Sequence, residues 1–479
     1  MIRRTKIIAT IGPASEAEPV LKEMIAAGMD AVRLNLSHGT LDDALELYHR
    51  VRRLSADVGK TVGTLVDLPG PKIRAGSFGK DGVHLPDGAS IRLVGGSERS
   101  TSEVVEVDYD GLLRDIETGD RLSFGDGAID VEIVDKSGEG LVAVVQHGGQ
   151  LSGRPGVHIP SDRIRVNTPT ATDLRILDAF VEAGVDMVAV SFVRSAHDVR
   201  RVGTELPPRG PLVIAKIETR SAVENLTGII DASGAVMIAR GDLGMECSIE
   251  ELPHLQKHII RECIAHGRPA ITATQMLESM VHAATPTRAE ASDVANAVFD
   301  GSSAVMLSGE TAVGGDPVNV IRTMARLCAR ADENFDVQNW ARMVSQLRTQ
   351  DVNVWVGGDP RVTDTMTNAA WRVADQLAAN AIICITRSGF TVRAIARFRP
   401  PTRILGFSPD ERTRHQLSIS WGATPLPLSG FNENDDMVRE AIDYARAQGY
   451  LRSGDTAVVL AGMDSTSRAT DVLRVVNVT

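Results

Sequence analysis

The sequence predicts an α/β protein with three domains: a (β/α)₈ TIM barrel, an all-β lid domain inserted into it, and a C-terminal α/β domain. Eight short apolar segments alternate with amphipathic stretches, which is the pattern of buried parallel strands with covering helices. The alternation stops at about residues 72–166, where short apolar runs are broken by Gly and Asp, as in all-β domains. A second α/β pattern begins near Thr363.

The predicted elements follow in chain order. The eight barrel strands are expected at residues 6–11, 30–34, 61–66, 186–191, 212–217, 235–238, 270–274 and 303–307. A long helix ends near Phe335, and strands of the last domain are expected at residues 381–386, 403–407 and 456–461. Because 479 residues exceed what one hydrophobic core supports, we divide the chain into several domains. The boundaries are 1–71 and 167–345 for the barrel, 72–166 for the lid, and 346–479 for the C-terminal domain.

The composition excludes several classes of protein. A net charge of −11 argues against nucleic acid or a membrane surface as a dedicated partner. No apolar run reaches membrane-spanning length, and the N-terminus shows no signal-peptide pattern. The four cysteines are widely spaced and form no Cys-x-x-Cys pair, so neither a zinc site nor a disulfide framework is expected. We expect a cytoplasmic protein with no nucleic-acid and no membrane partner.

Lys216 and Glu218 form the first candidate site. They stand two positions apart at the end of an apolar segment and therefore project from one face of a strand. Asp242, in the next strand-loop unit, is expected to bring a second carboxylate to the same edge of the barrel. Hard oxygen ligands beside a cation suit Mg²⁺ and phosphate. A solvated salt bridge and an ordinary turn are the alternative interpretations.

Polar residues also follow the second and third segments. Arg33, Asn35 and Ser37 alternate, so we expect them on one face where the strand leaves the barrel. Asp67 ends the next strand, and Arg74 lies just beyond a Pro-Gly-Pro turn. Two arginines and a carboxylate fit a polyphosphate site, whereas helix capping would explain any single polar residue here.

Thr274 ends the seventh segment, where the sequence predicts the start of a helix. A hydroxyl and free backbone N–H groups at such a position can hold an anion, for example a substrate carboxylate. A simple N-cap is the alternative.

The chain resembles the pyruvate kinase family along essentially its whole length. The motifs that carry the resemblance are Arg-Leu-Asn-Leu-Ser-His-Gly at 33–39, Ala-Lys-Ile-Glu at 215–218, Ala-Arg-Gly-Asp-Leu-Gly at 239–244, Ala-Thr-Gln-Met-Leu-Glu-Ser-Met at 273–280, Pro-Thr-Arg-Ala-Glu at 286–290 and Met-Leu-Ser-Gly-Glu-Thr at 306–311. The resemblance implies transfer of the phosphoryl group of phosphoenolpyruvate to ADP. The products are ATP and an enolate that is protonated to pyruvate.

The resemblance also implies a division of roles among the site residues. Glu218 and Asp242 would hold Mg²⁺, or Mn²⁺ in its place, Lys216 would stabilise the moving phosphoryl group, and Arg33 would meet its oxygens. Thr274 and the backbone at Gly241 and Asp242 would orient the substrate carboxylate. Thr274, Ser308 and a water chain remain open as donors of the proton to the enolate. Asn35, His38, Arg74 and Arg154 are implied on the nucleotide side, where Arg154 stands near the family's usual lysine.

Lys72 departs from the commonest family pattern, in which a glutamate stands at this position. Members with the glutamate bind K⁺ through residues that match Asn35, Ser37, Asp67 and a backbone carbonyl, here that of Leu68. The ammonium of Lys72 can supply this charge itself, so we expect that K⁺ is not required. The alternative is a solvated Lys72 at the lid hinge, with K⁺ still needed.

A second loop resembles the effector loop of the family. Thr386, Arg387, Ser388, Gly389 and Thr391 follow a predicted strand and precede a predicted helix, a setting that can cradle phosphate. A phosphorylated allosteric effector and a homotetramer are therefore expected from the resemblance. An ordinary strand-to-helix turn is the alternative interpretation of the loop.

Two other classes of function stay open at this point. A Mg²⁺-dependent lyase or aldolase of the phosphoenolpyruvate/pyruvate barrel type would share the carboxylate pair and the enolate, but would not need a nucleotide site or a lid. A non-enzymatic metabolite sensor would not need Lys216, Glu218, Asp242 and Thr274 together.

Overall fold

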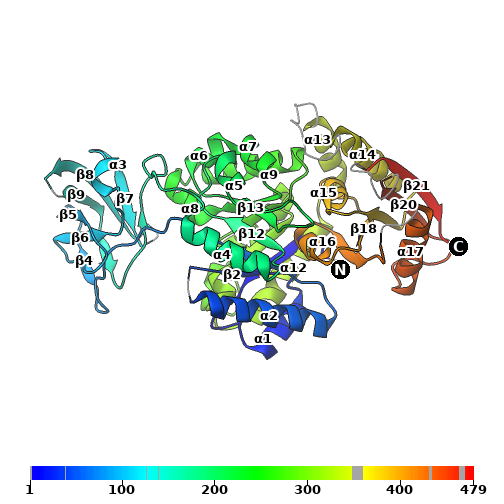
Figure 1. The fold of residues 1–479 in the computed structure, drawn as a ribbon, viewed down its shortest axis with the longest axis horizontal. Helices are drawn as coiled ribbons and strands as arrows, with labels where there is room; N and C mark the ends of the chain where they lie inside the picture. The colour runs from blue at the N-terminus through cyan, green and yellow to red at the C-terminus, as the bar shows by residue number, and fades with distance from the viewer. Residues whose placement is uncertain are drawn as a thin grey trace.

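The computed structural model describes residues 3–37, 39–125, 127–138, 140–347, 360–430, 434–462 and 470–479. At its centre is a closed barrel of eight parallel strands in the order β1-β16-β15-β14-β13-β12-β3-β2 (Figure 1). These strands are β1 (Lys6–Thr10), β2 (Ala31–Asn35), β3 (Gly63–Asp67), β12 (Met187–Val190), β13 (Leu212–Ile217), β14 (Ala235–Ala239), β15 (Ala270–Ala273) and β16 (Ala304–Leu307). The barrel prediction is confirmed, and each strand lies within two residues of its expected bounds.

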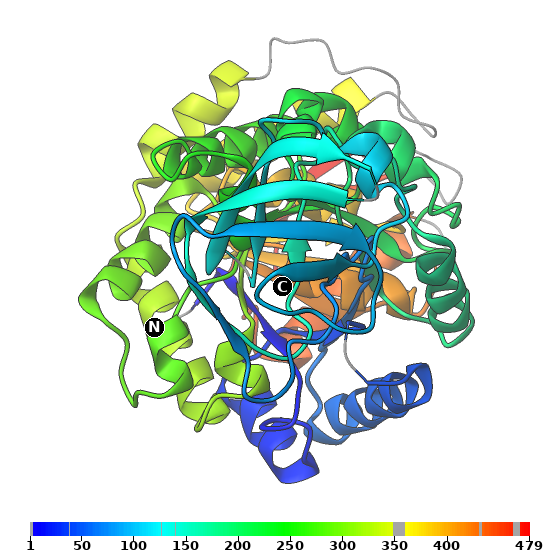
Figure 2. The ribbon, with the colours of Figure 1, turned by 90° about the vertical axis from the view of Figure 1, so that its left-hand side faces the viewer.

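Helices form the outer layer around the barrel (Figure 2). They are α1 (Glu18–Ala27), α2 (Leu41–Val58), α4 (Ala171–Glu182), α5 (Ala196–Arg200), α6 (Arg220–Glu224), α7 (Leu226–Ala232), α8 (Arg240–Glu246), α9 (Leu252–Ala265), η1 (Glu278–Val281), α10 (Arg288–Asp300), α11 (Gly309–Ala312), α12 (Pro317–Glu333) and α13 (Val337–Leu347). Helices α2, α4 and α10 each begin after a threonine, Thr40, Thr170 or Thr287, that forms a capping box. In the described part of the chain, every helix is too short or too polar to cross a membrane.

The lid is a separate β domain at one end of the molecule (Figure 1). It contains a six-stranded sheet in the order β11-β7-β8-β9-β5-β6 and the pair β10-β4, with its own apolar core. Its elements are β4 (Val83–Leu85), β5 (Ser90–Gly95), β6 (Val104–Val107), α3 (Leu112–Asp115), β7 (Arg121–Phe124), β8 (Ile129–Ser137), β9 (Gly140–His147), β10 (Gly149–Leu151) and β11 (Val157–His158). Because the chain enters the lid after β3 and returns before α4, the lid stands at the carboxyl ends of the barrel strands.

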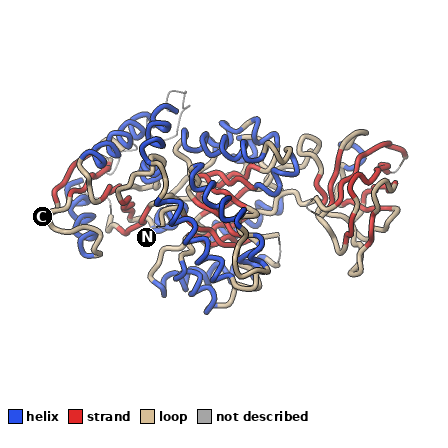
Figure 3. The backbone as a smooth tube through the Cα atoms, turned by 180° about the vertical axis from the view of Figure 1, so that it is seen from behind, coloured by secondary structure: helices blue, strands red, loops and turns tan. Residues whose placement is uncertain are grey.

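The C-terminal domain is built on a five-stranded sheet in the order β19-β18-β17-β20-β21. Helices lie beside this sheet (Figure 3). Its elements are α14 (Pro360–Gln376), β17 (Ala381–Ile385), α15 (Phe390–Ala396), β18 (Arg403–Ser408), α16 (Glu411–Gln416), η2 (Leu417–Ile419), β19 (Ala423–Pro427), α17 (Asn434–Ala447), β20 (Thr456–Ala461) and β21 (Val472–Asn477). The sequence pattern predicts β17, β18 and β20 but misses β19 and β21. Both are edge strands: β19 contains Pro425 and Pro427, which an edge tolerates, and β21 pairs antiparallel to β20.

The C-terminal domain covers the amino ends of the barrel strands. Ile419 is fully buried within the apolar cluster of the barrel interior. His415 Nδ1 lies 2.8 Å from the carbonyl oxygen of Val62, just before β3. Gln416 Nε2 donates to the carbonyl oxygen of Asp186, just before β12, at 3.0 Å. The lid and the C-terminal domain therefore occupy opposite ends of the barrel.

Arg399 joins the C-terminal domain to the barrel. Its guanidinium donates to the carbonyl oxygens of Val298 at 3.0 Å and Ser302 at 2.6 Å. It also lies over the rings of Phe335 and Trp421, 4.6 and 5.0 Å from their centroids. Burial lowers the pKa of Arg399 to about 10, so the side chain stays charged at neutral pH.

We expect the Arg399→Met variant to lower the free energy of unfolding by about 2–4 kcal/mol, because the buried carbonyl group of Ser302 loses its donor and that of Val298 keeps only the N–H of Gly301. Urea unfolding followed by tryptophan fluorescence measures this. The exposed Arg452 provides the control, since Arg452→Met should change the same quantity by less than about 0.5 kcal/mol. Equal midpoints for the two variants would contradict the role given to Arg399.

Candidate active site

Lys216 is the centre of a buried ion cluster at the carboxyl end of the barrel. It lies in β13, and its side chain is only 10% exposed. The ammonium Nζ lies 2.8 Å from Glu218 Oε1 and 3.2 Å from Asp67 Oδ1. Burial alone would lower the pKa of Lys216, but the two carboxylates outweigh burial and raise it. Lys216 therefore stays charged, and its placement beside Glu218 agrees with the strand periodicity.

Glu218 is a buried carboxylate with unused acceptor capacity. Its Oε2 accepts a hydrogen bond from the backbone N–H of Phe192 at 2.7 Å. Its Oε1 faces Lys216 Nζ but, among the described residues, has no partner in hydrogen-bond geometry. Burial raises the pKa of Glu218 to about 7 although Lys216 acts to lower it, and the charge of Asp242 adds to the effect of burial. Asp242 is exposed in the first turn of α8.

Asp67 pairs with two cations. Its Oδ2 lies 2.7 Å from Arg33 Nε, while its Oδ1 faces Lys216. Arg33 also donates through Nη1 to Thr10 Oγ1 at 3.0 Å. Burial would raise the pKa of Asp67, but Lys216 and Arg33 outweigh burial and lower it. The predicted meeting of Arg33 and Asp67 is thus observed, and both carboxylate oxygens of Asp67 are engaged.

Thr274 and Gly241 meet between β15 and α8. The N–H of Gly241 donates to Thr274 Oγ1 at 2.8 Å, and that hydroxyl donates to the carbonyl oxygen of Ala273 at 2.6 Å. The prediction that Thr274 begins or caps a helix is wrong, because the next helix, η1, starts at Glu278. Thr274 and Gln275 instead have φ angles of 66° and 51°. Such left-handed backbone costs of order 1–3 kcal/mol per residue and needs support from its surroundings.

Comparisons with known proteins decide the family. Residues 2–321 match the family model "Pyruvate kinase, barrel domain", and residues 364–476 match "Pyruvate kinase, alpha/beta domain". The chain belongs to the pyruvate kinase family. It is 37% identical to pyruvate kinase from Mycobacterium tuberculosis over 469 residues, which is 96% of this chain and 95% of that protein. It is 39% identical to the Corynebacterium glutamicum enzyme over 465 residues, or 96% and 94% of the two chains.

A solved structure of the pyruvate kinase family supports the same assignment. The crystal structure of a pyruvate kinase from Cryptosporidium parvum has a TM-score of 0.90 and 30% sequence identity, and the match covers 100% of this chain and 96% of that chain. The protein is therefore a phosphotransferase that acts on phosphoenolpyruvate and ADP and forms pyruvate and ATP. The lyase interpretation is not favoured.

Ser191 belongs to the ion cluster, although the sequence analysis does not select it. It follows β12 and is 3% exposed. Lys216 Nζ donates to Ser191 Oγ at 2.7 Å, and Ser191 Oγ donates to the carbonyl oxygen of Leu68, also at 2.7 Å. Ser191 ends a predicted strand, so the rule that selects polar residues at carboxyl ends of barrel strands could have found it.

The residues expected to bind K⁺, and Lys72, which is expected to replace that ion, lie around the ion cluster of Lys216. Asn35 ends β2 and accepts a hydrogen bond on Oδ1 from the backbone N–H of Ser37 at 3.2 Å. Ser37 lies in the turn after β2, so the predicted strand alternation is wrong beyond Asn35. Lys72 is exposed, and its pKa is lowered by partial burial and then by the charges of Arg74 and Lys216.

The two arginines expected near the nucleotide lie side by side at the base of the lid. Arg74 pairs with Gly156 in an isolated β-bridge and donates through Nη1 to the carbonyl oxygen of Arg154 at 3.1 Å. Arg154 Nη2 lies 3.4 Å from Asp108 Oδ2, so its guanidinium is engaged within the lid. His38 lies outside the described residues. The nucleotide contacts stay predictions.

Ser308 follows β16 at the same end of the barrel as Lys216. Its backbone N–H donates to Glu310 Oε2 at 2.7 Å. The second oxygen, Glu310 Oε1, accepts from the backbone N–H of Leu277 at 3.0 Å. Glu310 therefore ties the Ser308 turn to the segment after Thr274, and the role of Ser308 as a proton donor stays a prediction.

The candidate effector loop lies between β17 and α15, as the sequence predicts. Thr386 Oγ1 accepts from the backbone N–H of Gly389 at 3.0 Å, and Thr391 Oγ1 lies 2.6 Å from Thr470 Oγ1. Gly389 has a φ of 78°, and a Cβ there would lie 2.7 Å from Arg393 Nη1. Ser388 accepts from Arg393 Nη2 on its carbonyl oxygen at 2.9 Å, while Arg387 is exposed. Phosphate binding by this loop stays a prediction.

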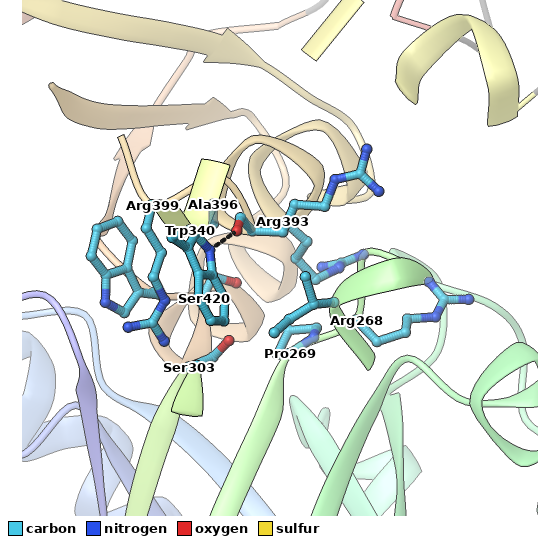
Figure 4. A pocket seen from close by; sticks show the side chains of 12 residues that line it. Arg268, Pro269, Ser303, Trp340, Arg393, Ala396, Arg399 and Ser420 are labelled. Carbon is cyan, nitrogen blue, oxygen red and sulfur yellow. Dashed lines mark hydrogen bonds between the residues drawn. The ribbon is translucent and has the colours of Figure 1, made fainter. Parts of the chain in front are cut away.

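A small arginine-lined pocket lies between the barrel and the C-terminal domain (Figure 4). Its lining includes Arg268, Arg393 and Arg399 together with Trp340. Burial lowers the pKa of Arg268 to about 9 and that of Arg393 to about 10. The cavity of about 20 Å³ has room for a water molecule. It stands at the amino end of the barrel, opposite Lys216.

We expect Glu218→Gln to abolish a loss of stability that the metal-free protein shows as the pH rises from about 4.5 to about 7. The pKa of Glu218 is about 7 in the folded protein, above its ordinary value of 4.5. Ionised Glu218 therefore lowers the free energy of unfolding above about pH 7, and this penalty disappears as the pH falls towards about 4.5. This pH-dependent penalty is up to about 3 kcal/mol. It is separate from the loss of a carboxylate partner of Lys216, which lowers the stability of Glu218→Gln at every pH.

Urea unfolding in metal-free buffer at several pH values tests this expectation. Glu310→Gln is the matched control, because Glu310 is equally buried but accepts two backbone N–H bonds and should destabilise the protein when replaced. Glu310→Gln should keep the pH dependence of the parent protein; if Glu218→Gln keeps it too, the pKa of Glu218 is not raised in the folded protein.

Proposed function

We propose that the barrel site transfers the phosphoryl group with Lys216 as its fixed positive charge. The observation that carries this proposal is the buried ammonium of Lys216, which two carboxylates keep charged. Phosphoryl transfer depends mainly on positioning and on neutralising charge. A pre-positioned cation in a water-poor site stabilises the developing negative charge without rearranging.

Glu218 and Asp242 would hold the Mg²⁺ that the pyruvate kinase family generally uses. The fit rests on Glu218, whose Oε1 has unused acceptor capacity and whose pKa is raised by burial. No group of three or more His, Cys, Asp or Glu residues gathers as a metal site within the described ranges, so substrate and water oxygens would complete the ligand set. When bound, Mg²⁺ supplies positive charge to the carboxylate and phosphoryl oxygens of the substrate. Mn²⁺ would take the same oxygen ligands.

The other residues would bind and orient the substrates. Arg33, held by Asp67, would meet the phosphoryl oxygens, while the Thr274 hydroxyl and the Gly241 N–H would bind the substrate carboxylate. The enolate would receive its proton from Thr274 Oγ1, from the Ser308 hydroxyl or from water. Asn35, His38, Arg74 and Arg154 would bind ADP as the lid closes and excludes water.

We extend the proposal to the setting of the enzyme. The chain would act in the cytoplasm as a homotetramer, with a phosphorylated effector bound at residues 386–391. Residues 1–71 and 167–345 would form the barrel, residues 72–166 the lid and residues 346–479 the effector domain.

The purified protein should form pyruvate from phosphoenolpyruvate only when ADP and Mg²⁺ are present. Lys216→Met should lower kcat by about 100- to 1000-fold, because it removes the fixed charge and keeps the side-chain volume. A direct assay of pyruvate measures both expectations. The control is Lys80→Met, which removes an exposed lysine of the lid and should leave kcat unchanged. Turnover without ADP, or a fully active Lys216→Met, would refute the proposal.

Potassium dependence tests the role proposed for Lys72. In Na⁺-balanced buffer without K⁺ the protein should be fully active, and added KCl should leave the rate unchanged. Lys72→Glu should lower the K⁺-free rate by about tenfold or more, since it reverses a charge near the phosphates, and KCl should restore it. The same change at Lys80 should have no such effect. A parent enzyme that works only with KCl would keep the kinase assignment and refute the role of Lys72.

A further inference from the structure

Arg240 holds the turn that contains Thr274. Its guanidinium donates to three successive carbonyl oxygens, those of Ala273 at 3.3 Å, Thr274 at 2.7 Å and Gln275 at 3.4 Å. These carbonyls converge because the backbone of Thr274 and Gln275 is left-handed. A left-handed conformation is unfavourable for a β-branched residue, so it persists only where neighbouring groups enforce it.

Arg240 is itself fixed from the opposite side. Its Nη1 donates to Asp293 Oδ1 of α10 at 2.8 Å and to Gln256 Oε1 of α9 at 3.3 Å. The Arg240 side chain is only 10% exposed, and its ion pair with Asp293 compensates for the burial of its positive charge. Residues of α9 and α10 therefore orient the guanidinium of Arg240 towards the Thr274 turn.

Arg240 also connects the Thr274 turn to Gly241 through the backbone. Arg240 directly precedes Gly241, whose N–H meets Thr274 Oγ1. One residue is thus bonded to Gly241 through the chain and to the Thr274 turn through its side chain. It sets the distance between the two groups that would bind the substrate carboxylate.

We infer that Arg240 is a positioning residue for the reaction, with Asp293 as its anchor, and that it presents the Thr274 hydroxyl and the Gly241 N–H to the carboxylate of phosphoenolpyruvate. This inference rests on the proposed role of Thr274 and Gly241. Without the guanidinium the three carbonyls lose a shared donor, the turn relaxes towards right-handed backbone, and the Thr274 hydroxyl moves away from Gly241.

The test measures the KM for phosphoenolpyruvate, the KM for ADP and kcat in Arg240→Ala. A misplacement of about 1 Å costs about 10- to 100-fold, so the KM for phosphoenolpyruvate should rise by that factor while the KM for ADP stays unchanged. Millimolar guanidinium chloride should fill the space left by the side chain and lower the raised KM again. Guanidinium should not rescue Arg240→Met, whose side chain occupies that space.

Two further variants keep the test decisive. Asp293→Asn leaves Arg240 in place and should raise the KM for phosphoenolpyruvate by a smaller factor in a folded protein. Arg3→Ala is the matched control, because Arg3 also binds a carbonyl oxygen, that of Gly28, and a carboxylate, that of Asp30, but at the amino end of the barrel. Arg3→Ala should leave both KM values unchanged.

The results distinguish a failure of the inference about Arg240 from a failure of the proposed role of Thr274 and Gly241 in binding the substrate carboxylate. If Thr274→Ala raises the KM for phosphoenolpyruvate but Arg240→Ala and Asp293→Asn do not, Arg240 has no positioning role. A parallel rise of both KM values without rescue by guanidinium would assign Arg240 a purely structural role. If Thr274→Ala leaves the KM unchanged, the carboxylate site itself is wrongly placed.

Discussion

The ammonium of Lys216 can be buried only because carboxylates from two different strands meet it. Transferring a charged group out of water is costly unless ion pairs and hydrogen bonds compensate the loss. In the barrel, β12 lies between β3 and β13, so Asp67, Ser191 and Lys216 arrive next to one another in that order. Ser191 bridges Lys216 to the backbone at Leu68, and Asp67 extends the cluster to Arg33. The charge of the site therefore depends on the adjacency of β3, β12 and β13.

The two inserted or appended domains use opposite ends of this barrel for a topological reason. A segment inserted after β3 must stand at the carboxyl ends of the strands, where the ion cluster lies. The C-terminal domain instead contacts the amino ends of the strands. Its Ile419 packs inside the barrel, and its Arg399 binds the carbonyl oxygen of Ser302 in the loop before β16. Its candidate effector loop is therefore separated from the ion cluster by the length of the barrel.

Helix α8 connects several parts of the site. It begins with Arg240, carries Gly241 and Asp242 in its first turn, and ends at Glu246. Glu246 accepts hydrogen bonds from the backbone N–H and the hydroxyl of Ser161, at 2.9 and 2.6 Å, on the segment that returns from the lid. A short helix is thus bonded both to the Thr274 turn and to the base of the lid. The left-handed backbone at Thr274 is one of the few places where local conformational preference is overruled, which is typical of functional sites.

The sequence by itself determined the barrel, the lid insertion and the residues at the strand ends, because apolar periodicity and the period of two along a strand are local properties. It placed Lys216, Glu218, Arg33 and Asp67 at one edge for this reason. The tertiary structure alone decided the pairing of Lys216 with Ser191, the left-handed turn at Thr274 and the reach of Arg240 to Asp293. These features depend on contacts between segments about 25 to 53 residues apart, which no local pattern encodes. The edge strands β19 and β21 belong with them, since prolines and exposed positions weaken the strand pattern and only pairing within the finished sheet defines them.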